Sequence, residues 1–245
     1  MVIFDPVKLA GWSSGRWRVA EPDLPLSGFG IDTRKLQAGQ IFIAIRAGDR
    51  DGHDFLERAK SRGASGAIVE REVPEVDLPQ LVVPDTVTGL MDIAGGHRAE
   101  FDGYVIGITG SCGKTSTKDV LALLMGSSST CKTRANLNNR LGLSLTLLGI
   151  DPAEHESAVV EAGISEPGEM DDLACTLQPD AAIVTLVGEA HIEGLGTLDA
   201  VAREKYRLLE SVRPGGFSLF PVECLGYPDF LQESAGHWIL CEVDP

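Results

Sequence analysis

The chain has 245 residues, and 43% of them are hydrophobic, enough for one large domain or two smaller domains with buried cores. Its 21 Lys and Arg against 36 Asp and Glu leave a net charge of −15. This argues against nucleic-acid binding, which depends on cationic contacts to phosphates. No apolar run is long enough to span a bilayer, and the first residues do not resemble a signal peptide. The five scattered cysteines, with no C-x-x-C pair, predict free thiols in a reducing cytoplasm.

The first hundred residues alternate strand and helix signals. Apolar runs predict strands at 41–45, 65–69 and 81–83, and helices are expected at 53–62 and from 85 to about 100. The segment Phe101-Asp-Gly103 is the best domain boundary, so we expect one domain over 1–103 and a second over 104–245.

Strands and helices continue to alternate after residue 103. Strands are expected at 105–108, 158–161, 181–187 and 217–220, with a last strand near 237–245, and helices at 114–125, 167–177 and 198–212. Strands separated by helices predict an α/β fold with a mainly parallel sheet covered on both faces.

A glycine loop joins the strand at 105–108 to the following helix. The sequence Gly110-Ser-Cys-Gly-Lys-Thr115 can aim several backbone N–H groups at a phosphate chain, with the positive end of the helix behind them. Lys114 would reach the outer phosphates and the Thr115 hydroxyl would bind Mg²⁺. The general phosphate-loop pattern requires glycine where this chain has Ile108, so the loop is a shorter G-x-x-G-K-T form.

Two polar residues follow other predicted strands. Glu161 ends the run Ala158-Val-Val and is a candidate Mg²⁺ ligand, because ligands gather at the carboxyl ends of parallel strands. Taken alone, it would be read in preference as a solvated carboxylate at the end of a strand. His191 follows the strand at 181–187 and could bind a metal, although a lone loop histidine is usually only a hydrogen-bonding group.

Lys205 lies on the apolar stripe of the helix at 198–212, at steps of three and four from Val201, Leu208 and Leu209. A lysine there either extends outward to water or has a buried partner, and the spacing does not decide between these. The run Asn136-Leu-Asn-Asn139 reads as a polar turn of low specificity.

Together these motifs resemble the Mur ligases, the ATP-dependent amide-forming enzymes of peptidoglycan synthesis. The short phosphate loop is the family's form. Further matches, in the family's order, span 136–148, 159–170 and 188–205, and the segments 32–34, 39–44 and 51–55 resemble its uridine-nucleotide-binding domain. The pattern is most similar to the members that add D-alanyl-D-alanine to UDP-N-acetylmuramoyl-tripeptide. Such a reaction proceeds through an acyl phosphate with ATP and Mg²⁺, which offsets the charge when two anions meet.

The resemblance implies roles for individual residues. Lys114, Glu161, His191 and Lys205 would act in catalysis, and Lys205 matches a lysine that is carbamylated in several members. Other positions would bind ligands. The ATP phosphates would be held by Gly110, Ser111, Cys112, Gly113, Lys114, Thr115 and Ser116, with Asn138 and Asn139 nearby. The metal would be bound by Thr115, Glu161, His191 and Lys205. The uridine substrate would be contacted by Thr33, Arg34, Asp51 and His53.

Two departures from the family pattern leave alternatives open. Leu186 stands where asparagine is expected, and the chain stops within what would be the central domain, so we expect it to be inactive alone and to lack a C-terminal half. The alternatives are a nucleotide-binding module without catalysis, or one subunit of a split ligase. An unrelated P-loop kinase is disfavoured by Asp32-Thr-Arg34 and by the 188–205 motif.

Overall fold

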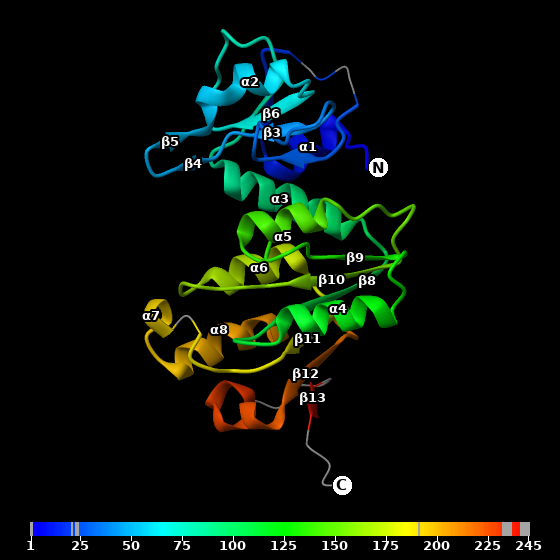
Figure 1. Cartoon of the computed structure of the whole chain (residues 1–245), viewed down its shortest axis with the longest axis vertical. Coiled ribbons are helices and arrows are strands. Elements are labelled where there is room, and N and C mark those ends of the chain that lie inside the picture. The colour runs from blue at the N-terminus through cyan, green and yellow to red at the C-terminus, as the bar shows by residue number, and fades with distance from the viewer. Residues whose placement is uncertain (1, 21, 23–24, 191, 232–236, 241–245) are drawn as a thin grey trace. The chain divides into compact units, whose positions relative to one another are not determined.

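The computed structural model describes residues 2–20, 22, 25–190, 192–231 and 237–240. The chain divides into two compact units, Met1–His97 and Arg98–Pro245 (Figure 1). The division falls within α3 (Thr86–Ala99), before the boundary predicted at residue 103. No helix in the described part of the chain is both long and apolar enough to cross a membrane.

The first unit is built on a five-stranded sheet with strand order β1-β7-β6-β3-β2, in which only β1 is antiparallel to its neighbour. Strands β3 and β6 are buried on both faces, as expected for the centre of a parallel sheet. The elements of this unit are α1 (Pro6–Ser13), β1 (Arg16–Arg18), β2 (Phe29–Gly30), β3 (Ile41–Ile43), β4 (Arg46–Ala47), β5 (Arg50–Asp51), η1 (Gly52–Phe55), α2 (Leu56–Ser61), β6 (Gly66–Val69) and β7 (Gln80–Val82).

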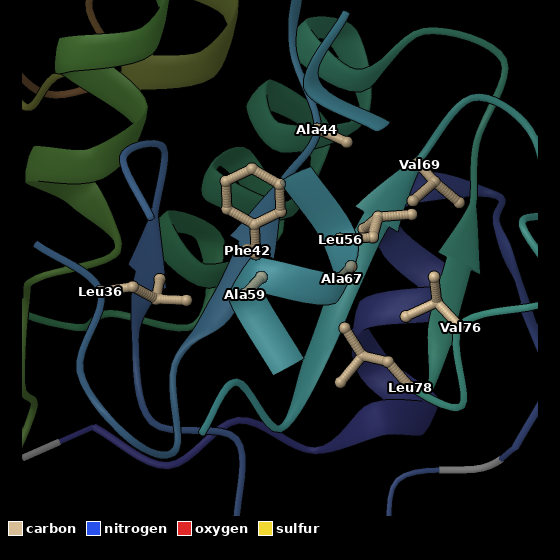
Figure 2. Close-up of a cluster of buried hydrophobic side chains, with 9 residues drawn as sticks. All are labelled: Leu36, Phe42, Ala44, Leu56, Ala59, Ala67, Val69, Val76 and Leu78. Atoms are coloured by element: carbon tan, nitrogen blue, oxygen red, sulfur yellow. The ribbon is translucent and has the colours of Figure 1, made fainter. Parts of the chain in front are cut away.

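Figure 2 shows the hydrophobic cluster on one face of that sheet. Phe42 from β3 and Ala67 and Val69 from β6 meet Leu56 and Ala59 of α2. Burial of this cluster removes apolar surface from water and fixes α2 over the sheet. A helix was predicted over 53–62. The structure has the 3₁₀ turn η1 over the first part of this range and the α-helix α2 from Leu56 to Ser61.

The second unit is a six-stranded parallel sheet with order β13-β12-β11-β8-β10-β9 (Figure 1). It confirms the predicted α/β class with a mainly parallel sheet. Its elements are β8 (Tyr104–Thr109), α4 (Lys114–Leu124), β9 (Thr130–Lys132), α5 (Arg140–Leu147), β10 (Ser157–Glu161), α6 (Glu169–Leu177), β11 (Ala181–Val184), α7 (Ile192–Leu195), α8 (Leu198–Glu210), β12 (Phe217–Pro221), η2 (Val222–Gly226), η3 (Pro228–Leu231) and β13 (His237–Leu240).

Side-chain alternation along β8 places the helices of this unit. Ile106 and Ile108 pack with Ala122 of α4 on one face of the sheet. Gly107 points to the other face, where an added Cβ would meet Leu177 of α6 and Leu208 of α8. The sheet is therefore covered on both faces, as predicted.

Several predicted boundaries in the second unit are wrong by one to three residues; the helix expected to reach residue 212, for example, ends at Glu210. The helix expected from residue 167 begins at Glu169, because Gly168 has a left-handed backbone with φ +83° and cannot continue an α-helix. The strand expected to reach residue 187 ends at Val184, and the following residues turn toward the glycine loop. The cysteines that the structure describes, Cys112, Cys131, Cys175 and Cys224, are free thiols as predicted, and Cys241 lies outside the described residues.

Candidate functional site

The glycine loop between β8 and α4 has backbone conformations that glycine permits. Gly110 has φ +147° and Gly113 has φ +87°, and a Cβ on Gly110 would collide with Thr185 Oγ1. Gly113 is the N-cap of α4, and no side chain caps this helix end. The first N–H groups of α4 are therefore without a side-chain partner, the arrangement that suits an anion.

The residues after β11 fasten this loop. Thr185 Oγ1 donates to Thr109 O at 3.2 Å and to Cys112 O at 2.5 Å, and Ser111 N donates to Leu186 O at 2.8 Å. Ser111 Oγ also exchanges hydrogen bonds with the backbone of Gly188. Only the backbone of Leu186 is used here, so the leucine in place of the expected asparagine does not disturb this contact. Thr185 had not been predicted, because the strand was expected to continue through it.

Lys114 folds over the loop, and its Nζ donates to Gly110 O at 2.6 Å. Burial lowers the pKa of Lys114, while the charge of Glu161 acts in the opposite direction. The side chain is thus held within the loop that it was predicted to serve.

Glu161 is brought to the loop by the register of the sheet. It lies on the same face of β10 as Val159, the face covered by α4, and pairs in register with Ile108 of β8. The side chain is 1% exposed, and Thr115 Oγ1 donates to its Oε2 at 3.4 Å. The structure therefore brings together the predicted metal ligands Thr115 and Glu161, from elements far apart in the sequence.

These residues fit a magnesium-bound triphosphate. Glu161 Oε1 is a buried oxygen with no hydrogen-bond partner in the described part of the chain, although a cation lies near it. Mg²⁺ typically takes only one or two protein oxygens, with phosphate and water completing its shell. No group of three His, Cys, Asp or Glu side chains gathers among the described residues, and His191, predicted as a further ligand, lies outside them.

The cation near Glu161 is Lys118, which was not predicted as a site residue. Its Nζ lies 3.3 Å from Glu161 Oε1 and donates to Thr133 O at 3.0 Å. Lys118 is one turn beyond Thr115 on α4, so both side chains point to the same carboxylate.

Lys205 of α8 is buried, with 1% of its surface exposed, which resolves the two alternatives left by the sequence in favour of burial. Burial lowers its pKa to about 8, and the charge of Lys114 contributes to this shift, while Glu204 opposes it. The influence of Lys114 links Lys205 electrostatically to the glycine loop. The neighbouring Glu204 accepts a hydrogen bond from Gly168 N at 3.0 Å at the start of α6.

The structure gives the asparagine run a structural role, whereas its place near the ATP phosphates stays a prediction. Asn139 is the N-cap of α5, and its side chain accepts from Gly142 N. Asn138 packs against Gly163, just beyond Glu161 on the chain, and its O accepts from Gly163 N at 2.8 Å. Asn138 therefore lies beside the carboxyl end of β10, whereas the side chain of Asn139 is occupied in capping.

In the first unit, a cavity of about 460 Å³ lies at the carboxyl ends of β2 and β3. Thr33, Arg34, Arg50 and Arg58 are among the lining residues, together with the ring of Phe55. A cavity that combines cationic side chains with an aromatic ring suits an anionic ligand that carries a flat ring. Both Thr33 and Arg34, predicted as substrate contacts, belong to it.

An exposed ion pair sits on the wall of this cavity. The Arg34 guanidinium donates to both Asp32 carboxylate oxygens, at 2.8 to 3.2 Å, and holds the pKa of Asp32 well below its ordinary value. The Arg34 side chain is 74% exposed. Arg34 is therefore held in place by Asp32 and remains accessible to a ligand.

Asp51 and His53, also predicted as substrate contacts, are not among the residues that line this cavity. His53 is buried, with Nδ1 at 2.6 Å from Asp51 Oδ1 and Nε2 accepting from Glu70 N at 3.0 Å. Asp51 also accepts from Arg71 at 2.8 Å. In this geometry the two side chains tie β5 and η1 to the residues that follow β6, and contact with a substrate stays a prediction.

Comparison with known proteins agrees with this geometry. The Mur ligase middle domain matches residues 108–239, more than half of the chain. The UDP-N-acetylmuramoyl-tripeptide–D-alanyl-D-alanine ligase of Bacillus subtilis is 37% identical over 198 residues, covering 80% of this chain and 43% of that protein. The chain spans about half the length of the relatives that it matches.

Solved structures show the same similarity. A crystal structure of MurF from Acinetobacter baumannii superposes with a TM-score of 0.87 at 30% identity, covering 98% of this chain and 53% of that one. MurF from Thermotoga maritima, solved in complex with ADP, has a TM-score of 0.75 at 29% identity, covering 87% of this chain and 49% of that one. The predicted resemblance is thus confirmed in sequence and in fold.

Proposed function

This chain belongs to the Mur ligase family, and we propose that it carries the uridine-substrate and ATP-phosphate sites of a ligase that joins D-alanyl-D-alanine to UDP-N-acetylmuramoyl-tripeptide. The observation that carries the proposal is the meeting of Thr115 and Glu161 beside the glycine loop. A carboxylate aligned with a phosphate loop suits phosphoryl transfer from a magnesium-bound nucleotide. Because ATP and uridine nucleotides are cytoplasmic metabolites, we place the reaction in the cytoplasm.

The proposed reaction has two steps. A carboxylate oxygen of the tripeptide attacks the γ-phosphorus of ATP, and ADP leaves. The amine of D-alanyl-D-alanine then attacks the carbonyl carbon of the acyl phosphate, inorganic phosphate leaves, and the nitrogen loses a proton. The first step brings two anions together, so cations at the site lower its barrier.

The residues of the glycine loop hold the ATP in this proposal. The backbone N–H groups of the loop from Gly110 to Ser116 and the start of α4 face the phosphates, and Lys114 offsets their charge. Thr115 and Glu161 would hold Mg²⁺, and His191 would be a further ligand. The bound Mg²⁺ would supply charge neutralisation at the transferred phosphoryl group. Asn138 lies near this edge of the sheet. Asn139 would support this position of Asn138 by capping the start of α5.

Lys205 is proposed to be carbamylated. Its lowered pKa, about 8, leaves part of the side chain as the neutral amine near neutral pH, and a neutral amine can attack CO₂. The new N–C bond forms as the nitrogen loses a proton, and the product is an anion that can accept Mg²⁺. This change would also remove the repulsion between Lys205 and Lys114.

The uridine nucleotide is proposed to bind in the cavity of the first unit. Arg34, held by Asp32, would meet a phosphate of the nucleotide, and Thr33 would donate a hydrogen bond from the cavity wall. Asp51 and His53 would support this site by bracing the adjacent chain.

Cys112 provides a direct test of the ATP site, because it is an exposed thiol within the glycine loop. Alkylation by iodoacetamide can be followed by peptide mass spectrometry, with the exposed Cys175 of α6 as the internal control. We expect ATP with Mg²⁺ to slow alkylation of Cys112 several-fold without affecting Cys175, and Lys114→Ala to remove the protection. Equal rates with and without saturating ATP would contradict a phosphate site at this loop.

Calorimetric titration with UDP-N-acetylmuramoyl-tripeptide tests the other half of the proposal. We expect saturable binding that a free uridine nucleotide competes for. If ATP binds and the uridine substrate does not, the chain is a nucleotide-binding module and the proposed substrate is wrong.

A further inference from the structure

Helix α4 buries a charged side chain and exposes several apolar ones. It buries Lys118, which is 3% exposed, together with Ala122. On the same helix Val120, Leu123 and Leu124 are 55%, 69% and 76% exposed. Burying an ammonium group is costly unless it is paired, so a buried lysine on a helix with exposed leucines indicates a local requirement for that cation.

The contacts of Lys118 identify that requirement. Its Nζ lies 3.3 Å from Glu161 Oε1, donates to Thr133 O at 3.0 Å, and lies 3.6 Å from Asp119 Oδ1 at the surface. Thr133 is fully buried, and its Oγ1 accepts from Glu161 N at 2.9 Å. Lys118 and Thr133 therefore hold Glu161 by its side chain and by its backbone.

The two oxygens of the Glu161 carboxylate have different neighbours. Lys118 lies beside Oε1, whereas Thr115 Oγ1 donates to Oε2 at 3.4 Å. An ion pair at Oε1 fixes the rotation of the carboxylate and turns Oε2 toward Thr115, the other predicted magnesium ligand. Partners of metal ligands commonly orient them in this way.

We propose that Lys118 is a positioning residue for the metal site: it holds Glu161 so that Oε2 and the Thr115 hydroxyl face one magnesium ion together. The inference rests on the proposed function, because it assumes that magnesium–ATP binds at this loop. Lys118 acts through Glu161 and does not touch the phosphates, which are left to Lys114 and the loop amides.

The test is calorimetric titration of ATP in the presence of Mg²⁺ and in the presence of EDTA. The measured quantity is the gain in affinity that Mg²⁺ produces. For Lys118→Met we expect this gain to fall about tenfold or more, the size typical when a partner of a metal ligand is lost. The affinity for ATP in EDTA should stay close to that of the wild type. The matched control is Lys132→Met. Lys132 is an exposed lysine of β9, and its Nζ lies 2.7 Å from Oδ1 of Asp119, which is next to Lys118 on α4.

A merely structural role for Lys118 would not change the magnesium-dependent gain selectively. A loss of ATP affinity in EDTA equal to the loss in Mg²⁺ would overturn the proposal, and so would an unchanged gain in Lys118→Met. If the wild type does not bind ATP at all, the proposed function fails instead, so the two failures are distinguishable.

Lys118→Met leaves a buried carboxylate without its cation and could fail to fold. The double variant Lys118→Met/Glu161→Gln removes both charges, and its magnesium-dependent gain is compared with that of Glu161→Gln alone. If Lys118 acts through Glu161, the two gains are equal, because the second substitution has nothing left to remove. A smaller gain in the double variant would show that Lys118 acts independently and would contradict the proposal.

Discussion

The two units differ in whether their charged side chains are buried or exposed. The buried Asp, Glu, Lys and Arg side chains of the described residues, namely Arg98, Lys118, Glu161, Glu204 and Lys205, all lie in the second unit. In the first unit the candidate binding charges, such as Arg34 and its partner Asp32, lie on the wall of an open cavity. Ion pairs in water contribute little to folding, whereas a buried charge that loses its partner is strongly destabilising.

This difference determines which substitutions can separate an effect on binding from an effect on folding. In the first unit a cation can be removed without disturbing the core, so a change in affinity can be read directly. In the second unit the candidate site is part of the core, so every change to Glu161 or Lys205 alters stability as well. Paired variants are needed there to distinguish the two effects.

The largest expected effect is that of Arg98→Ala. The Arg98 guanidinium is fully buried and donates to Leu177 O, Phe101 O and Gln178 O, and to Asp180 Oδ2 at 2.8 Å. Its removal takes this donor from the three carbonyls and the buried cation from Asp180, and should lower the free energy of unfolding by about 3–5 kcal/mol. Urea unfolding measures this. The control is Arg213→Ala, which removes the half-exposed second partner of Asp180 and should cost less than about 1 kcal/mol. Equal losses in the two variants would show that burial does not set the cost.

The second effect concerns Lys205 and pH. Its pKa is lowered from 10.5 to about 8 in the folded protein, so between these values the unfolded chain binds more protons than the folded chain. Stability contributed by this group should therefore rise with pH from about 8 to about 10.5, by about 3 kcal/mol in total. The measurement is the difference in unfolding free energy between wild type and Lys205→Met at several pH values, in buffers purged of CO₂. A difference that falls with pH would contradict a buried, unmodified ammonium.

The smallest effect on folding is expected for Arg34→Ala, because the side chain is largely exposed. The thermal unfolding midpoint should be unchanged within error, while affinity for the uridine substrate falls about tenfold from the loss of a charged hydrogen bond. The exposed Arg62 at the end of α2, outside the cavity, provides the control substitution Arg62→Ala. Similar affinities in the two variants would remove Arg34 from the binding site.

The strand, glycine loop and α4 could be predicted from the sequence, because their signals are local. The helical spacing placed Lys205 on the apolar stripe of its helix but did not decide whether the side chain is buried or extends to water. The Thr185 contacts to the loop and the Lys118–Glu161 pair could not be predicted, because they depend on β11 and β10 both lying beside β8 in the sheet. Helix α1 was not predicted although Asp5 and Pro6 are an N-cap and first-turn signal, and no helix was expected over 140–147, where α5 lies.

The central claim is that the first unit binds the uridine substrate and the glycine loop of the second unit binds ATP. A crossed calorimetric titration tests it most directly, with wild type, Arg34→Ala and Lys114→Ala each titrated with UDP-N-acetylmuramoyl-tripeptide and with magnesium–ATP. We expect Arg34→Ala to weaken only the uridine substrate and Lys114→Ala to weaken only ATP. If Lys114→Ala binds ATP as well as the wild type, or if Arg34→Ala loses both ligands equally, the assignment of the two sites is wrong.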